Sequence, residues 1–268
     1  MNQTRFERQI RISGRLIFDT AFHIGTGREG ELATDMGVLK DEKDWPVLPG
    51  STLKGSFRAG AEKLASYLGL SACMLDNDIS GQRCVGDQQY FRKVNETFKS
   101  QKSEMDKLNW LKKNTCNICQ LFGSPLQASR IFFSDGKLSR WQGRYQVRDG
   151  VVIDRDSGTA RPRLKYNFEV ASRDTAFEIC IDLENPEAKE LAIVGAVLSE
   201  WQSGFRLGGF TSRGLGRVVL TNIKTEQVDY RNAAHLKDYL LLRRMQPADG
   251  LLPQTLQNVL INQGGVSC

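Results

Sequence analysis

Residues 8–20 read RQIRISGRLIFDT and define the first element of the fold. Apolar side chains occupy every second position along most of this stretch, and polar or basic residues lie between them. The apolar positions are Ile10, Ile12, Leu16 and Phe18. Because successive side chains of a strand point to opposite faces of a sheet, this alternation predicts a β-strand with one buried face.

Residues 46–64, PVLPGSTLKGSFRAGAEKL, have helical spacing instead. A proline–glycine turn precedes the helix, and Ser51 or Thr52 can cap its first amides. The apolar face consists of Leu53, Phe57, Ala61 and Leu64. Lys54 and Arg58 lie one turn apart beside this face, near the positive end of the helix dipole, so both are candidates for binding an anion.

The same patterns predict three further strands and a second helix along the chain. The strands are expected at 129–134, 177–183 and 218–223, and the helix at 187–206. A helix near 232–246 and a polar tail follow. Without the insertion and hairpin described below, the order is strand, helix, strand, strand, helix, strand. This order predicts an α+β fold with a ferredoxin-like, or RRM-like, βαββαβ palm.

The positive charge of the chain is concentrated in one segment. The 268 residues carry a net charge of +6. From Lys137 to Arg173, nine basic residues against four acidic ones give a net of +5. Within this segment YQVRDGVVID, residues 145–154, predicts a β-hairpin that turns at Asp149–Gly150. An anionic partner such as a nucleic acid fits this distribution.

Residues 70–119 have a different composition and are interpreted as an insertion. They are polar and contain four of the six cysteines, which are Cys73, Cys84, Cys116 and Cys119. A CxxC pair binds zinc when a second pair arrives from elsewhere in the chain. We therefore expect structural zinc, with four unrelated thiols as the alternative. A metal would also stabilise a segment that offers few apolar side chains for a core.

The segment LGGFTSRGLGRV, residues 207–218, is rich in glycine and arginine. Glycines allow the backbone to approach a ligand closely and to offer its amides to phosphate, so phosphate binding is predicted here. A tight turn between helix and strand is the alternative. The predicted contacts are Gly208, Gly209, Ser212, Arg213, Gly214 and Gly216.

A second polar segment, residues 24–37, is expected to be irregular. Asp35 lies in it and His23 directly precedes it, and either residue alone is a weak candidate for catalysis. The N-terminus has no apolar stretch of signal-peptide length, and no later segment approaches a membrane span. These features predict a cytoplasmic protein.

Several of these motifs together resemble one family. In chain order they are FHIGTGREG (22–30), TDMGVLKD (34–41), PVLPGSTLKGSFR (46–58), CNICQLFGS (116–124) and LGGFTSRGLGRV (207–218). They are similar to the RAMP superfamily of CRISPR-associated proteins, which act in antiviral defence. Within it they look most like the repeated backbone subunit of type III effector complexes. The resemblance covers roughly residues 8–223.

The resemblance implies a domain organisation. Residues 1–69 and 120–225 would form the ferredoxin-like core, including a β-hairpin thumb at about 137–173. Residues 70–119 would be an insertion of the zinc-bearing kind, and residues 226–268 a helical extension with a tail.

The resemblance also implies a function. Such subunits bind guide RNA together with other effector subunits, including copies of themselves, and Asp35 would cleave target single-stranded RNA with Mg²⁺ or Mn²⁺ by 2′-hydroxyl attack. No membrane partner is expected. Besides the residues of the glycine-rich segment, the implied RNA contacts are His23, Lys54, Arg58, Arg148, Arg155, Arg161 and Arg163.

Two alternatives stay open. The chain could be a non-catalytic guide-RNA scaffold of the same complex, or a standalone endoribonuclease that cuts the guide precursor. His23 would be the catalytic candidate in the second case.

Overall fold

The computed structural model describes residues 6–25, 36–73 and 84–262, and the side chains at 161–164 lie outside this description. Strand β1 (Arg8–Phe18) is central in the main sheet. It pairs antiparallel with β6 (Ala176–Glu184) on one side and β8 (Arg217–Asp229) on the other. Every second residue of β1 from Ile10 is buried, as the alternation predicted.

The sheet has the order β2-β6-β1-β8-β7, and two short strands extend it along β6 and β8. The additional strands are β2 (Ile131–Phe133), β3 (Lys137–Arg140), β7 (Phe205–Arg206) and β9 (Gln246–Pro247). Helix α1 (Gly50–Leu64) connects β1 to β2, and α6 (Ala188–Ser203) connects β6 to β8. Antiparallel neighbours with these two crossovers form the ferredoxin-like palm, so the predicted fold class is confirmed.

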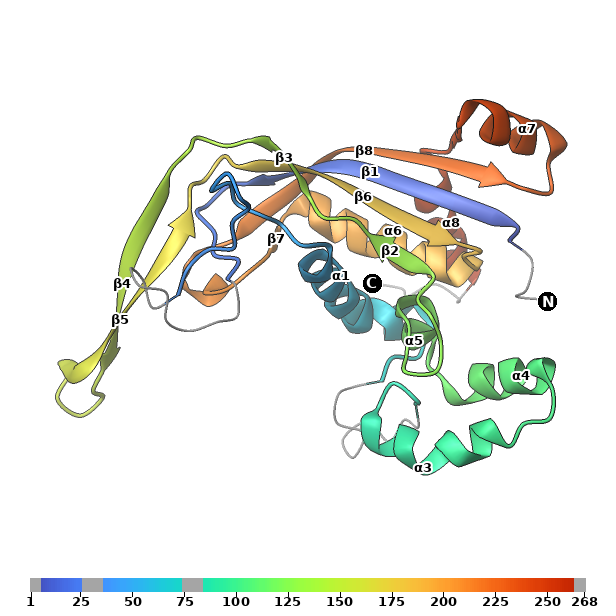
Figure 1. The fold of residues 1–268 in the computed structure, drawn as a ribbon, viewed down its shortest axis with the longest axis horizontal. Helices are drawn as coiled ribbons and strands as arrows, with labels where there is room; N and C mark the ends of the chain where they lie inside the picture. The colour runs from blue at the N-terminus through green and yellow to red at the C-terminus, as the bar shows by residue number, and fades with distance from the viewer. Residues whose placement is uncertain (1–5, 26–35, 74–83, 263–268) are drawn as a thin grey trace.

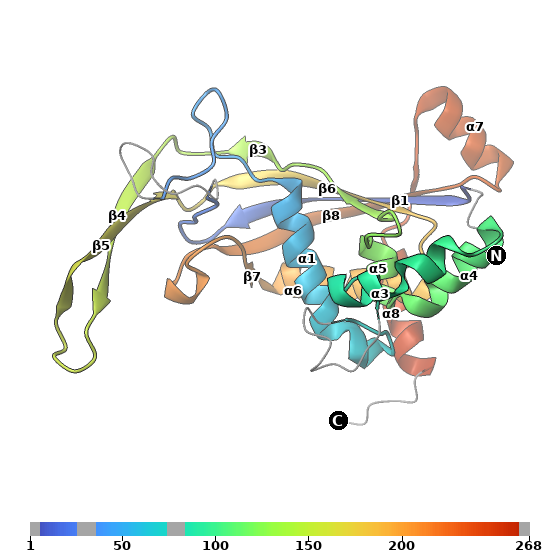
Figure 2. The same cartoon turned by 60° about the horizontal axis from the view of Figure 1, so that its bottom comes forward.

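Helices α1 and α6 cover one face of the palm sheet (Figure 1). Their apolar sides meet in the core, where the rings of Phe57 and Trp201 pack edge to face with centroids 5.1 Å apart. Helix α8 (Leu251–Asn262) packs against α6 with Leu252 buried (Figures 1 and 2). The expectation of a polar tail is therefore wrong for residues 251–262. The apolar side of α8 packs against α6, which lies about 60 residues earlier in the sequence, and Leu252 contacts Gly195 there.

The thumb is a separate two-stranded hairpin that projects from the palm (Figures 1 and 2). It consists of β4 (Tyr145–Ile153) and β5 (Ala160–Ala171), in which Arg161 and Arg163 lie. The expected span of 137–173 was too long, because β3 pairs with β6 in the palm sheet.

The predicted turn at Asp149–Gly150 is wrong, because both residues lie within β4. The chain turns instead at residues 154–159, where the amide of Asp154 donates to the carbonyl of Thr159 at 2.8 Å. Gly150 pairs with Tyr166 of β5, and a Cβ at position 150 would lie 2.3 Å from the tyrosine ring. The glycine therefore makes room for an aromatic ring across the hairpin.

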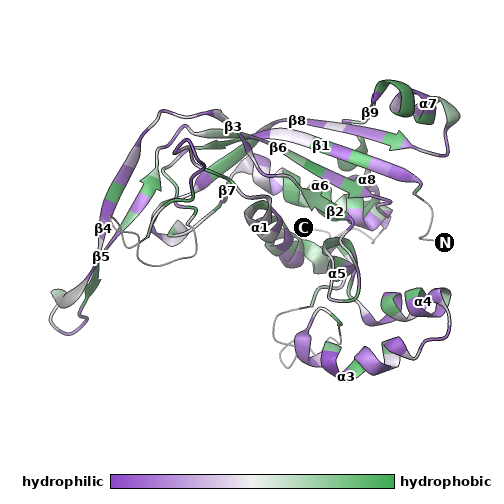
Figure 3. Ribbon diagram, viewed as in Figure 1, coloured by the Kyte–Doolittle hydropathy of each residue, from purple (hydrophilic) through white to green (hydrophobic). Residues whose placement is uncertain are grey.

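In the described part of the insertion, α3 (Gln88–Lys99) and α4 (Glu104–Asn114) lie apart from the sheet (Figure 1). The insertion is preceded by η1 (Ala65–Leu68) and leads into α5 (Asn117–Phe122), and both of these elements pack in the palm core. No residue of α3 is buried, and hydrophilic residues dominate that helix (Figure 3). At the other end of the molecule from the thumb, α7 (Ala233–Leu242) follows β8. The glycine-rich loop contains the short helix η2 (Thr211–Arg213).

Candidate nucleic-acid interface and metal centre

The N-terminus of α1 already binds a carboxylate of this chain. The amide of Gly50 donates to Oδ1 of Asp135 at 2.7 Å. The N-cap residue is Pro49, which makes no side-chain cap of its own, so the expected capping by Ser51 or Thr52 is wrong. Asp135 lies between β2 and β3, in a segment that runs beside the start of α1, where the amide of Gly136 donates to the carbonyl of Leu48 at 2.8 Å. The sequence around α1 could not reveal this contact, because Asp135 lies 85 residues after Gly50 in the chain.

The two cations of α1 also have partners within the chain. The ammonium of Lys54 donates to the hydroxyl of Ser129 at 3.0 Å, and burial together with the charge of Arg58 lowers the pKa of Lys54. The guanidinium of Arg58 donates to Glu62 at 2.8 Å and to Sγ of Cys119 at 3.2 Å. Arg58 therefore points to the cysteine insertion.

Several glycines of the glycine-rich loop permit close approach to the chain itself. The amide of Gly209 donates to the carbonyl of His23 at 2.7 Å, and a Cβ at Gly208 would lie 2.3 Å from the same oxygen. At Gly216, which has a φ of +71°, a Cβ would lie 2.1 Å from the carbonyl of Leu207. These glycines are needed for packing, whatever else the loop binds.

The tip of the loop faces solvent. Ser212, Arg213 and Gly214 are exposed, and a Cβ at Gly214 would meet no atom within 4 Å. The guanidinium of Arg213 donates to the hydroxyl of Tyr166 on β5 and lies 5.4 Å from the ring centroid of Phe210. The loop therefore presents a cation beside two aromatic rings.

His23 lies in the interior beneath this loop, with only 6% of its surface exposed. Its Nδ1 is 2.7 Å from the carbonyl of Glu169, so this nitrogen carries the proton. Phe168 and Phe210 pack edge-on against the imidazole. The ring supports the loop from within, and an RNA contact of His23 remains a prediction.

Residues 166–171 of β5, here called the thumb base, join this loop to the segment that follows Asp35. Phe168 stacks on Phe210 of the loop with ring centroids 4.3 Å apart. The carboxylate of Glu169 accepts hydrogen bonds from Lys40 at 2.9 Å and from the amide of Val38 at 3.1 Å. The amide of Glu169 donates to the carbonyl of Met36, the residue after Asp35. Asp35 itself lies outside the described residues.

The predicted basic residues of the thumb are placed along its length. Arg148 on β4 and Arg155 in the turn are both exposed. Arg161 and Arg163 lie on β5, and their side chains are outside the description. The thumb thus holds its exposed cations away from the palm, where a polyanion can reach them.

The four predicted cysteines form one buried cluster. All four Sγ atoms lie within 4.8 Å of one another, although the cysteines come from two separate segments. Hydrogen bonds among the thiols, first of all with Cys116, lower the pKa of Cys84 and raise that of Cys119. Four soft sulfur donors in one small volume can bind a metal ion such as zinc.

The surroundings of the cluster fit a bound metal. Backbone amides of Gly86 and Cys116 donate to Sγ of Cys84, both at 3.3 Å, and the amide of Cys119 donates to Sγ of Cys116 at 3.4 Å. A Cβ at Gly86 would lie 2.5 Å from Sγ of Cys119, so only glycine leaves room there. Amides that donate to sulfur are a common second layer around metal-bound thiolates.

A family model described as the RAMP superfamily matches residues 15–219, which include the end of β1, the thumb, both palm helices and the glycine-rich loop. The chain belongs to the RAMP superfamily. Membership indicates a CRISPR-associated protein that binds RNA. No curated protein matches the chain. Among the described residues, no helix combines the length and apolar character that a membrane crossing requires.

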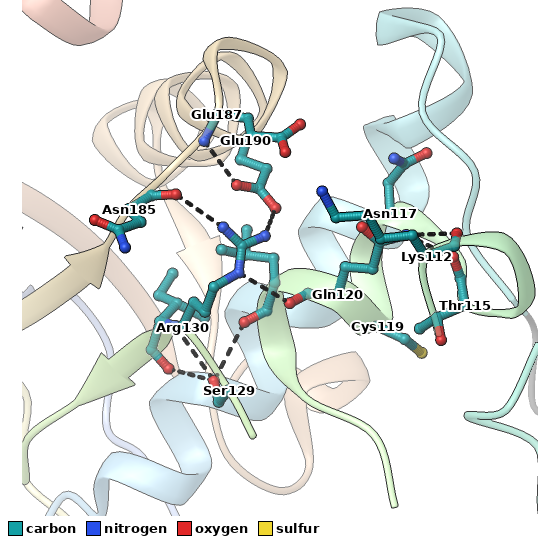
Figure 4. Close-up of polar contacts among 12 residues, drawn as sticks. Lys112, Thr115, Asn117, Cys119, Gln120, Ser129, Arg130, Asn185, Glu187 and Glu190 are labelled. Atoms are coloured by element: carbon teal, nitrogen blue, oxygen red, sulfur yellow. Dashed lines mark hydrogen bonds and ion pairs between the residues drawn. The ribbon is translucent and has the colours of Figure 1, made fainter. Parts of the chain in front are cut away.

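In this RAMP protein, Figure 4 shows how α5, which carries Cys119, is held to the palm. The carbonyl of Gln120 accepts from Nε of Arg130 at 3.4 Å. The guanidinium of Arg130 also donates to the carbonyl of Asn185 at 2.9 Å and pairs with the carboxylate of Glu190 on α6. One partly buried cation therefore joins the cysteine cluster's helix to the end of β6 and to α6.

The predicted site residues of this RAMP protein divide into two groups. The glycine-rich loop and His23 gather at the thumb base, whereas Arg58 lies at the cysteine cluster. Sequence reasoning missed the aromatic cluster formed by Tyr166 and Phe168 of the thumb base with Phe210 of the glycine-rich loop. The alternation of Tyr166, Phe168 and Val170 in β5 could have indicated this cluster, because residues at every second position lie on one face of a strand.

Proposed function

We propose that this RAMP protein is a backbone subunit of a type III CRISPR effector complex and binds guide RNA at the thumb base. The supporting observation is the placement of Arg213 beside Tyr166 and Phe210. Single-stranded RNA is bound by cations on its phosphates and by aromatic rings beside its bases. An exposed arginine and two rings at one junction offer both kinds of contact.

The thumb would provide further contacts along the RNA. Arg148 and Arg155 are exposed on a hairpin that extends away from the palm. Contacts of this kind are made to phosphates, so binding would not depend on sequence and would weaken as salt increases. The buried His23 would act indirectly by supporting the loop. Lys54 donates a hydrogen bond to Ser129, so only the exposed part of its side chain would contact RNA.

We propose in addition that Asp35 directs cleavage of target RNA. A divalent cation held by this carboxylate would stabilise the negative charge that develops on the phosphate. The 2′-hydroxyl of the preceding ribose would lose its proton to solvent and attack the phosphorus, and the P–O5′ bond would break as the departing 5′ oxygen takes up a proton from solvent. The products are a 2′,3′-cyclic phosphate and a 5′-hydroxyl. Support comes from Met36, whose carbonyl accepts from Glu169 and so ties the segment after Asp35 to the thumb base.

Reconstituted complexes with Asp35→Ala test the cleavage proposal. The variant is expected to retain guide RNA and to lose the cut opposite this subunit. Glu42→Ala, an exposed acidic residue a few positions further on, is the control and should cut normally. Undiminished cutting by Asp35→Ala would show that this subunit is a scaffold or uses another residue.

Sequencing of the RNA that copurifies with the protein from its native host tests guide binding. Short RNAs that share one end and differ in the remainder are expected. Incubation of the isolated protein with repeat RNA in chelator tests the precursor endoribonuclease, because specific cutting without metal favours that function. The burial of His23 opposes it, since a general base must reach the ribose.

The cysteine cluster is proposed to hold one structural zinc ion. Four protein ligands fill the coordination of zinc and leave no position for a reacting water. Metal analysis of protein purified without chelator should therefore give one zinc ion per chain. Two or more metals per chain, or none, would contradict this.

A further inference from the structure

Arg58 is a palm side chain that reaches the cysteine cluster. Its Nη2 donates to Sγ of Cys119 at 3.2 Å, and its Nε donates to Glu62 one turn further along α1 at 2.8 Å. The side chain is 33% exposed, whereas Cys119 is fully buried. Glu62 fixes the direction of the guanidinium, so the contact with sulfur is part of an ordered arrangement.

The charge of the cluster explains why a cation belongs there. Four thiolates around Zn²⁺ leave a net charge of −2 in a buried volume, and such charge is costly unless it is paired. Backbone amides donate to Cys84 and Cys116, as described above. Cys119 receives its N–H donor from Arg58 instead. Among the described contacts, Cys119 is therefore the cysteine whose sulfur accepts a hydrogen bond from a positively charged side chain.

Building on the proposed zinc ion, we propose that Arg58 is a metal-retaining residue that binds the Cys119 thiolate and joins the metal centre to α1. Arg58 does not hold guide phosphate, and the anion that its position on α1 suggested is the metal–thiolate cluster. Partners that donate to metal ligands raise metal affinity by about 10- to 100-fold. A guanidinium suits this role because it keeps its charge when partly buried and donates to two groups at once.

The test compares zinc retention in the full chain with Arg58→Met and a matched control. Lys63→Met removes one positive charge from the same helix at a side chain that is 72% exposed and bonded to Glu200. Competition with a chromophoric chelator gives the zinc affinity of each protein. Arg58→Met is expected to bind zinc about 10- to 100-fold more weakly, and Lys63→Met should match the unaltered protein. Guide-RNA affinity is measured on the same zinc-saturated samples and should be equal in all three.

Unchanged zinc affinity in Arg58→Met, with or without loss of RNA affinity, overturns the inference. An unaltered chain that binds no zinc overturns it as well, and the RNA measurement on that sample shows separately whether guide binding fails. If Arg58→Met does not fold, Arg58→Lys with cobalt(II) in place of zinc decides. Weaker cobalt binding and a shifted thiolate-to-cobalt absorption band support the inference, and a spectrum and affinity like those of the unaltered protein refute it.

Discussion

Gly208 lies directly against the carbonyl oxygen of His23, with a φ of +94° and no space for a side chain. The neighbouring amide of Gly209 donates to the same oxygen. The glycine-rich loop is thereby fixed to the segment that follows β1, and this contact supports its exposed tip.

Gly208→Ala is therefore expected to destabilise the protein. Strained backbone costs about 1–3 kcal/mol, and the clash with the His23 oxygen adds to it. Denaturant unfolding measures the loss. Gly214→Ala is the matched control, since its φ is +87° but its surroundings are open, so it should lose only about 1–2 kcal/mol. Equal losses in the two variants would contradict the packing role of Gly208.

The pair of Arg130 and Glu190 predicts a pH-dependent effect. Burial raises the pKa of Glu190, and the charge of Arg130 opposes that rise. In Arg130→Met the pKa rises further, so the folded state holds a proton that the unfolded state releases as pH increases. Stability then falls with rising pH, and the variant should lose about 3–5 kcal/mol at neutral pH and less under acidic conditions.

Unfolding free energies at about pH 5 and about pH 8 measure this dependence. Adding Glu190→Gln to Arg130→Met removes the titrating carboxylate, so the double variant should lose the extra pH dependence. A loss in Arg130→Met that is the same at both pH values would exclude an unpaired carboxylate as its cause.

Removing the metal is expected to destabilise the protein, because the cluster holds two chain segments together. Stabilisation by a ligand at 1,000 times its Kd is about 4 kcal/mol, so chelation should lower the free energy of unfolding by roughly this amount. Cys84→Ser should behave like chelated protein. Cys180→Ser, at a free cysteine of β6 outside the cluster, should keep both metal and stability. Stability that chelator leaves unchanged would rule out a structural role for the metal.

Arg213→Ala is expected to weaken binding to every RNA sequence alike. Each lost phosphate contact should lower the slope of log affinity against log salt by ~0.7 for a single strand. Arg231→Ala gives the same change in net charge at an exposed residue near α7, at the other end of the molecule from the thumb. Titration with labelled RNA at several salt concentrations distinguishes the two. An Arg213 variant with an unchanged slope would place the RNA elsewhere.

The palm could be predicted from the sequence because its patterns are local. The alternation in β1 and the apolar stripe of α6 each identify an element without reference to the rest of the chain. The cysteine cluster was predictable for a similar reason, since four thiols that include a CxxC pair in a polar segment are typical of a metal site. The structure brings all four together.

The failures occurred where a distant partner decides the outcome. Asp149–Gly150 has the composition of a turn, but Tyr166 across the hairpin needs the space above the glycine. The groups that bind the first amide of α1 and the guanidinium of Arg58 include Asp135 and the sulfur of Cys119, which lie far along the chain. The sequence around α1 shows the cations Lys54 and Arg58 but not these distant partners.

The central position of β1 has a consequence during synthesis. Its partners in β6 and β8 lie about 175 and 220 residues further along the chain, as the pairs Gln9–Glu184 and Gln9–Val228 show. A growing chain therefore carries its first apolar strand unpaired until most of the protein has left the ribosome. Both edges of that strand are free to join a neighbouring nascent chain in the meantime. Production of this protein should accordingly benefit from chaperones that cover the N-terminal strand until its partners have been synthesised.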